Sequence, residues 1–331
     1  MSNIQWTDIT SNPIHLVRPD GSHGGHWCKK ISPGCANCYA EAQNNNKFFS
    51  FASGLPYTGN APENLILDEK VLQEWLKIKQ PQKIFVCSMT DMFAEWVSDE
   101  WLDRIFAYMC IAHWHTYQIL TKRADRLPKY FTLESASRVS RLAHQLLKDG
   151  VAGKERQDYV NKRCIITNIN EFWPRHNIWI GVSVEDQKSN DERIPYLLET
   201  PAAVRFLSCE PLLEWIKLTL SAKILNPDTP HLWSKEDDSG TITREINWVI
   251  VGGESGSNAR NTYIDHLRSV VHQCQEANIK VLVKQVGAKP VAHWDKENEI
   301  LTMHRISDRK GGILEEFPPD LQIRQFPTFN Q

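Results

Sequence analysis

Three cysteines within eleven residues constrain this chain more than any other feature of its sequence. Cys35 and Cys38 form a C-x2-C pair directly after a Pro-Gly dipeptide, and Cys28 lies seven residues upstream of that pair. Proline fixes φ and glycine permits a tight turn, so this loop can bring two thiolates to one point. No fourth cysteine follows nearby. Four thiolates close a structural zinc site, whereas three leave a metal centre with an open position.

The spacing alone leaves two interpretations open. The three cysteines can hold three irons of a [4Fe–4S] cluster, whose fourth iron is then free to bind a small molecule. They can instead form a structural Cys3His zinc site with His23 or His26 as the fourth ligand. A third interpretation, three buried or free thiols, is less favoured because the cysteines crowd beside a turn.

The composition favours a soluble protein of the cytoplasm. The 331 residues are 41% hydrophobic and 24% charged, with no run of eighteen apolar residues and no recognisable signal peptide. In that compartment thiols stay reduced, so clustered cysteines indicate metal or redox chemistry rather than disulfides. The net charge of −2 gives no support for a global attraction to nucleic acid. The scattered cysteines are expected to be small buried hydrophobic residues: Cys87, Cys110, Cys164, Cys209 and Cys274.

Short apolar segments that end in polar clusters alternate along the chain with helical segments. Strands are predicted at 4–10, 83–87, 116–120, 178–182, 204–208, 248–251 and 281–283. Their continuous apolar character is typical of a parallel sheet covered on both faces, and strand–helix alternation gives right-handed βαβ units. We therefore predict an α/β protein with a full or partial (β/α) barrel of about six to seven parallel strands. An open doubly wound sheet is less favoured, since no G-x-G-x-x-G fingerprint follows the first strand.

Helices are predicted over 39–49, 99–113, 193–199 and 265–277. Two stretches interrupt the alternation: a basic segment at about 129–175, predicted to be a helical insertion, and a polar segment at 220–244, predicted to be a loop. We expect residues 1–290 to form the barrel and residues 291–331 to cover one of its ends.

Polar residues follow nearly every predicted strand. Functional groups gather at the carboxyl ends of strands in parallel α/β folds, so we interpret these residues as the rim of an active site. The basic pair of Lys122 and Arg123 suits a carboxylate or a phosphate. The polar rim residues are Ser88, Thr90, Asp91, Thr121, Lys122, Arg123, Ser183, Glu185, Asp186, Glu210, Glu254, Lys284 and Gln285. The adjacent Gly252 and Gly253 allow close backbone approach.

The segments that carry these residues resemble those of the phage and bacterial "three-Cys-motif" family over nearly the whole chain. They are WTD at 6–8, SPGCANCYAE at 32–41, SMTDMF at 88–93, LTKR at 120–123, GVSVE at 181–185, RFLSCEPLL at 205–213 and GGESG at 252–256. A three-cysteine loop after the first strand is also similar to the radical S-adenosylmethionine superfamily, whose usual spacing is C-x3-C-x2-C rather than the C-x6-C-x2-C found here. The strand ends at 90–91 and 121–122 have a distant likeness to spore photoproduct lyase, a radical enzyme that acts on DNA.

The resemblance implies a radical S-adenosylmethionine enzyme. Cys28, Cys35 and Cys38 would hold a [4Fe–4S] cluster whose fourth iron binds S-adenosyl-L-methionine, and one electron would generate a 5′-deoxyadenosyl radical. The cofactor-binding residues expected on this basis are Ser88, Thr90, Asp91, Ser183, Glu185, Gly252, Gly253 and Glu254. The expected catalytic residues are Lys122, Glu210 and Cys209, the last as a hydrogen-atom donor, although a packed thiol is the simpler interpretation of Cys209.

The resemblance also implies partners. Family members often accompany a "three-Cys-motif partner" protein, the cluster needs a reductant, and the likeness to spore photoproduct lyase makes nucleic acid the suggested substrate. No membrane association is expected. The alternative is a zinc-stabilised Cys3His module that binds nucleic acid or a partner protein without catalysis, based on His23, His26 and the basic segment at 129–175.

Overall fold

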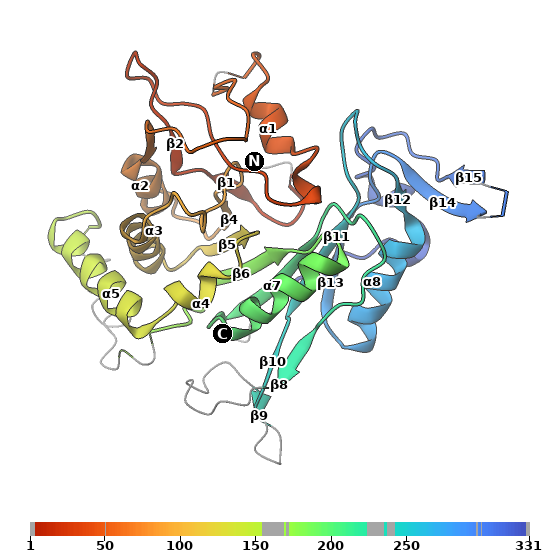
Figure 1. Ribbon diagram of the computed structural model, residues 1–331. Coiled ribbons are helices and arrows are strands. Elements are labelled where there is room, and N and C mark those ends of the chain that lie inside the picture. Colours follow the sequence, from red (N-terminus) through yellow and green to blue (C-terminus); the bar gives the residue numbers. More distant parts are fainter. Residues whose placement is uncertain are drawn as a thin grey trace.

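A seven-stranded parallel sheet organises the fold (Figure 1). The computed structural model describes residues 4–49, 51–153, 169, 172–223, 235–236, 242–295, 297–298 and 300–328. Each neighbouring pair of strands in the sheet is parallel. In spatial order the strands are β1 (Ile9–Ser11), β4 (Lys83–Val86), β5 (Thr116–Thr121), β6 (Ile178–Ser183), β7 (Val204–Cys209), β11 (Trp248–Gly252) and β13 (Lys280–Gln285).

The spatial order of these strands follows their order in the chain without a reversal, and the two end strands β1 and β13 do not pair. A doubly wound sheet would reverse direction at a switch point, so that fold is excluded. The sheet instead curls into a half-barrel, which confirms the prediction of a partial (β/α) barrel. All seven strands lie where the sequence predicts them except the first, which begins at Ile9 because a turn from Ile4 to Thr7 precedes it.

Helices cover the convex face of the half-barrel (Figure 1). They are α2 (Glu69–Lys77), α3 (Asp99–Ile111), α4 (Arg126–Tyr130), α5 (Leu133–Lys148), α7 (Gln187–Glu199) and α8 (Ile264–Glu276). The amphipathic helix predicted at 99–113 is α3, whose N-cap is Ser98. Helix α7 starts earlier than the predicted residue 193 because Asp186 and Ser189 form a capping box. None of the described helices is long and apolar enough to cross a membrane.

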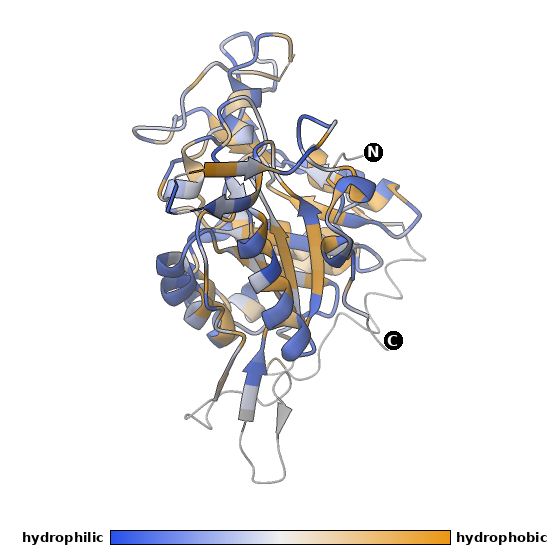
Figure 2. Cartoon of the chain, turned by 90° about the vertical axis from the view of Figure 1, so that its right-hand side faces the viewer, coloured by the Kyte–Doolittle hydropathy of each residue, from blue (hydrophilic) through white to orange (hydrophobic). Residues whose placement is uncertain are grey.

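Aromatic residues fill the amino-terminal half of the concave face. Trp6, Phe85, Trp179, Phe206 and Trp248 form one buried cluster, in which the Trp6 and Phe85 ring centroids lie 4.6 Å apart. Alternate residues of each strand point to this face, and the others point to the helices. Figure 2 shows the resulting hydrophobic strands at the centre of the molecule. Because this end is packed, only the carboxyl ends of the strands are left for a polar site.

Three smaller sheets flank the half-barrel. β2 (Ile14–Leu16) pairs with β3 (Leu65–Leu67) ahead of α2. β8 (Ser221–Lys223), β10 (Ile242–Glu245) and β9 (Lys235–Glu236) form an antiparallel arm where the sequence predicted only a loop. The prediction was wrong there because polar composition concealed β-branched residues such as those of β10. β12 (Thr262–Tyr263), β14 (Pro290–Asp295) and β15 (Ile300–Met303) form the third sheet.

The C-terminal segment borders the edge strand β13. Val283 N donates to Ile323 O at 2.8 Å, and Gln325 N donates to Val281 O at 3.0 Å. The Phe326 ring then packs near the aromatic cluster of the concave face. The segment therefore covers one edge and the amino-terminal end of the half-barrel, opposite the predicted site.

Candidate active site at the carboxyl ends of the strands

The cysteine loop, residues 27–41, is shaped by a short turn and by the start of a helix. Pro33–Cys35 form a 3-10 turn in which Cys35 N donates to Ser32 O at 2.9 Å. Cys38 is the N-cap residue of α1 (Tyr39–Asn44). Proline at the start of the turn presets its φ. Cys28, Cys35 and Cys38 are all partly exposed residues, and Cys28 and Cys38 pack against the edge of the core.

Ser32 ties this loop to the ends of β5 and β6. Its hydroxyl donates to Glu185 Oε1 and accepts from Lys122 Nζ at 3.1 Å, while Lys122 Nζ lies 3.0 Å from the same Glu185 oxygen. Arg193 of α7 donates to the other carboxylate oxygen, Glu185 Oε2, at 2.7 Å. Glu185 is completely buried. Two residues predicted to contact cofactor or substrate, Lys122 and Glu185, are therefore engaged in fixing the cysteine loop.

Glu254, which follows β11, is the second anchor of the loop. Asn37 Nδ2 donates to Glu254 Oε2 at 2.9 Å. Arg260 Nη2 donates to Glu254 Oε1 at 2.6 Å, and Arg260 Nη1 donates to Pro33 O at 3.1 Å. The carboxylate thus holds the loop on both sides of Cys35, once directly and once through Arg260.

Residues that follow β4 hold the two ends of the loop. Thr90 Oγ1 donates to Trp27 O at 2.7 Å, directly before the first cysteine. Tyr39 OH donates to Ser88 O at 2.7 Å, directly after the third cysteine. Ser88 and Thr90, both predicted to bind the cofactor, therefore position the segment that carries the thiols.

Asp91 joins the ends of β4 and β5 and has no free acceptor capacity. Its carboxylate accepts from Thr121 Oγ1 at 2.7 Å, from Lys122 N at 3.0 Å, from Arg123 Nη1 at 3.0 Å and from a further backbone N–H. Four donors fill the lone-pair sites of a carboxylate. Arg123 Nη2 in turn donates to Lys29 O at 3.3 Å, so Asp91 supports the loop through Arg123.

The positive charges of Lys122 and Arg193 around Glu185, the first anchor of the cysteine loop, favour the ionised form of Glu185. Lys122 also favours the ionised form of Cys35. Burial alone would raise the pKa of Glu185, but Lys122 and Arg193 outweigh burial and lower this pKa to about 2. Burial likewise opposes the thiolate of Cys35, yet Lys122 and hydrogen bonds from the loop lower the pKa of Cys35 below its usual value. The thiolate is the form of cysteine that binds metal.

The other two loop thiols are harder to ionise. Burial raises the pKa of Cys28 to about 12, and Asp91 and the other two thiols add to that shift. Burial also raises the pKa of Cys38, with a contribution from Cys35. The three thiols therefore lie within electrostatic reach of one another. A bound metal cation would reverse these shifts, because it deprotonates a coordinating thiol.

The three thiols are not gathered as tightly as the ligands of one zinc ion. Zn–S bonds of about 2.3 Å place neighbouring sulfurs roughly 3.8 Å apart. The described residues contain one set of three ligand atoms within 4.8 Å of one another, and it consists of His15, His23 and Asp68. His23 is thus engaged away from the cysteines. His26, the other candidate for a Cys3His site, is buried with its Nδ1 3.3 Å from the carbonyl oxygen of Ile14.

Glu210, Gly252 and Gly253 lie at the ends of β7 and β11 and bond to the neighbouring strand ends. Glu210 Oε1 accepts from Lys284 Nζ at 2.6 Å and from Gln285 Nε2 at 2.8 Å. Gly253 N donates to Gln285 O at 3.0 Å, and Gly252 O accepts a backbone hydrogen bond at 2.9 Å. The two glycines therefore pack the strand ends closely together, and Glu210 with Lys284 forms a separate polar pair on the rim.

Two further predicted residues are buried in the sheet. Ser183 is buried at the end of β6, and its carbonyl accepts from Arg193 Nη1 at 2.8 Å. Cys209 is completely buried in the core that faces the helices, and burial, Cys274 of α8 and Glu185 raise its pKa. The structure therefore places Cys209 among packed side chains, as the simpler interpretation of that residue expects. Cys164 lies outside the described residues.

Sequence reasoning missed four residues that complete the anchors: Ser32, Asn37, Arg193 and Arg260. Ser32 and Asn37 are polar residues inside the cysteine loop, which is a signal that the sequence offered. Nothing in the sequence indicates that Arg193 and Arg260 would turn toward Glu185 and Glu254, because both arginines lie in segments whose sequence indicates only helix or loop.

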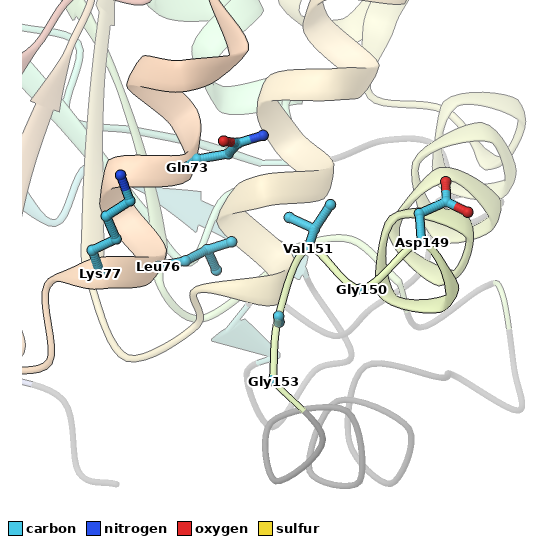
Figure 3. A pocket seen from close by; sticks show the side chains of 8 residues that line it. Gln73, Leu76, Lys77, Asp149, Gly150, Val151 and Gly153 are labelled. Atoms are coloured by element: carbon cyan, nitrogen blue, oxygen red, sulfur yellow. The ribbon is translucent and has the colours of Figure 1, made fainter.

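Neither of two surface hollows is lined by the three cysteines. One hollow of about 390 Å³ is lined by the end of α2 and by residues 149–153 (Figure 3). Since α2 leads into β4, this hollow lies toward the amino-terminal end of the sheet, away from the cysteine loop. A second hollow of about 510 Å³ is lined in part by Arg123, Arg126 and Lys129, beside the Asp91 anchor.

Comparison with known proteins gives a family for this chain. Residues 1–316 match the model of a family whose description is "Protein of unknown function (DUF5131)". No curated protein matches the chain, and no solved structure matches it.

Proposed function

We propose that this chain, which belongs to the DUF5131 family, is a radical S-adenosylmethionine enzyme whose [4Fe–4S] cluster is held by Cys28, Cys35 and Cys38. The observation that carries the proposal is the docking of a three-thiol loop on the carboxyl ends of a parallel half-barrel. The Ser32–Glu185 and Asn37–Glu254 hydrogen bonds fix that docking. The resemblance to the three-Cys-motif family supports the same assignment.

The donor set fits a cluster with one free iron. Three partly exposed thiols interact electrostatically, and the other described cysteines, Cys87, Cys110, Cys209 and Cys274, are buried. The three sulfurs do not all lie within 4.8 Å of one another, whereas thiolates on one zinc ion lie roughly 3.8 Å apart. Both candidates for a histidine ligand of zinc are engaged elsewhere, which argues against the Cys3His alternative.

When bound, the cluster and S-adenosyl-L-methionine would supply one-electron cleavage of the sulfonium, driven by an external reductant, and a 5′-deoxyadenosyl radical that abstracts hydrogen from the substrate. The protein itself would contribute charged side chains that set the ionisation of the cysteine ligands. Lys122 favours the thiolate of Cys35, and Glu185 balances Lys122 and Arg193 at the same point. The aromatic cluster fills the amino-terminal half of the concave face, so that half holds no space for water.

Most of the predicted cofactor residues are positioning residues in this proposal. Ser88, Thr90, Asp91, Glu185 and Glu254 are engaged with the cysteine loop or with the arginines beside it. They act by holding the thiols toward the rim. Lys284 and Glu210 are paired with each other rather than with the loop, so we assign contact with S-adenosyl-L-methionine or substrate to them.

The proposed substrate and partners rest on the resemblance to the three-Cys-motif family and to spore photoproduct lyase, and the net charge of the chain does not support them. A nucleic-acid substrate and a three-Cys-motif partner protein are proposed on that basis. The basic segment adds little support, because Arg138 of α5 pairs with Asp103 at 2.6 Å, and residues 154–168 lie outside the described residues. Copurification of nucleic acid with the anaerobically isolated protein would test the substrate class.

Anaerobic reconstitution with iron and sulfide tests the central proposal. We expect about four irons per chain and thiolate-to-iron charge-transfer absorbance. Dithionite should then convert S-adenosyl-L-methionine to 5′-deoxyadenosine. Replacement of Cys28, Cys35 and Cys38 by serine should abolish both signals, whereas Cys110→Ser, at a buried cysteine of α3, should keep them. A protein that binds four irons without cleaving the cofactor would overturn the proposal.

A further inference from the structure

Three potential metal ligands converge on one point outside the cysteine loop. His15 lies on β2, His23 lies in the loop that follows it, and Asp68 is the N-cap residue of α2. His15 Nε2 lies 3.0 Å from His23 Nδ1, His23 Nδ1 lies 2.9 Å from Asp68 Oδ2, and His15 Nε2 lies 3.4 Å from the same oxygen. Pairing of β2 with β3, directly ahead of Asp68, brings these segments together.

When both imidazoles are neutral, hydrogen bonding alone leaves one hydrogen to serve the two remaining acceptors of this triangle. His15 Nδ1 lies 3.3 Å from the carbonyl oxygen of Asn12, which can only accept, so the neutral ring carries its hydrogen on Nδ1. Nε2 of His15 then directs a lone pair into the triangle, as does the carboxylate oxygen of Asp68. His23 Nδ1 can share at most one hydrogen between these two acceptors. A cation at the centre would satisfy all three atoms at once.

The spacing of the three atoms suits a tetrahedral metal ion. Bonds of about 2.0–2.1 Å to nitrogen and oxygen place neighbouring ligand atoms roughly 3.3 Å apart, close to the 2.9, 3.0 and 3.4 Å found here. The ligands are also held in place from outside. The Asn12 carbonyl orients His15, and Lys70 N donates to the second oxygen of Asp68 at 2.9 Å.

We propose that His15, His23 and Asp68 bind a divalent transition-metal ion of the Zn²⁺ class. Neutral imidazoles and a carboxylate are the ligand types that such ions take. The side chain of His23 is 44% exposed, so the fourth coordination position opens to solvent and can hold water. The ion would fasten the segment that runs from β2 toward Cys28 to the start of α2. This site does not depend on the function of the cysteine loop.

Zinc titration of a chain that lacks the loop thiols tests the site without interference from them. With Cys28, Cys35 and Cys38 replaced by serine, the full chain should bind one Zn²⁺ in isothermal titration calorimetry. His23→Ala and Asp68→Asn should each weaken binding at least tenfold, since even loss of a partner that only orients a ligand costs roughly that much. The second variant would still cap α2, because asparagine is a good N-cap residue.

A control variant at another histidine and a thermal-unfolding measurement distinguish specific zinc binding from nonspecific binding and from loss of folding. The exposed side chains of His272 and Glu276 on α8, with His272 Nδ1 3.3 Å from Glu276 Oε2, form a histidine–carboxylate pair without a second histidine, so His272→Ala should leave zinc affinity unchanged. Zn²⁺ should raise the thermal midpoint of the parent but not that of His23→Ala, while both unfold alike without zinc. If the serine background fails to fold, Co²⁺ added to the wild-type chain should give ligand-field bands that His23→Ala lacks. Absence of binding, or binding unaffected by His23→Ala, would overturn the proposal.

Discussion

Ser32 and Glu185, separated by 153 positions in the chain, share a hydrogen bond that joins the cysteine loop to the end of β6. Lys122, from the neighbouring strand β5, contacts both residues. One buried carboxylate therefore fixes the position of the loop and offsets the cations around it. We therefore expect loss of the Glu185 carboxylate to lower the free energy of unfolding and to weaken binding of the proposed iron–sulfur cluster.

Glu185→Gln should destabilise the protein strongly. The substitution leaves Lys122 and Arg193 without their buried counter-charge, and breaking a buried ion pair on one side costs about 3–5 kcal/mol. Urea denaturation should show this loss in the free energy of unfolding. Glu134→Gln is the control, because Glu134 is 84% exposed and lies 3.4 Å from Arg138; its loss should cost less than about 1 kcal/mol. Equal effects of the two substitutions would refute the anchoring role of Glu185.

The same carboxylate should make stability fall in acid. The pKa of Glu185 is about 2 in the folded protein, below its ordinary value of 4.5. Its contribution is therefore fully present above pH 4.5 and is lost as the pH falls toward 2, because the unfolded state binds the proton more readily. The difference in unfolding free energy between wild type and Glu185→Gln should shrink over that range. A difference that stays constant with pH would contradict the prediction.

Alkylation should distinguish the loop thiols in protein without bound metal. The pKa of Cys35 is lowered beside Lys122, whereas that of Cys28 is raised to about 12. Since the thiolate is the nucleophile, iodoacetamide at neutral pH should modify Cys35 well before Cys28, as followed by peptide mass spectrometry. Lys122→Met should slow the reaction of Cys35. Faster alkylation of Cys28, or no effect of Lys122→Met, would argue against the charge arrangement.

Gly181→Ala should strain the concave face. A Cβ at residue 181 would overlap the ring of Phe206, which belongs to the buried aromatic cluster. Overpacking of a core costs about 1–3 kcal/mol, so the thermal midpoint should fall. Gly153→Ala serves as the comparison, because nothing lies within 4 Å of a Cβ there. Recovery of stability on adding Phe206→Leu would identify the overlap as the cause, and an unchanged midpoint would rule it out.

The sequence was sufficient to predict the strands and to place a group of polar residues at their carboxyl ends. Continuous apolar segments such as 178–182 identify buried parallel strands, since few other structures place that many β-branched and aromatic residues in a row. The helix at 99–113 is likewise predicted from the periodicity of its apolar residues. Polar residues after those strands, Asp91 and Glu185 among them, were correctly expected at one rim.

What each rim residue contacts was decided only by the tertiary structure. Asn37 meets Glu254 across 217 positions, and Ser32 meets Glu185 across 153, because the sheet curls and carries strand ends far apart in sequence to one loop. The same holds for His15, His23 and Asp68, which no spacing in the chain connects. Residue type and periodicity report on local backbone and burial, whereas the choice of partner depends on how distant strands are placed by packing. The sequence by itself therefore determined where the strands lie, which polar residues follow them and which cysteines share one loop. The folded sheet determined which side chains hold that loop in place.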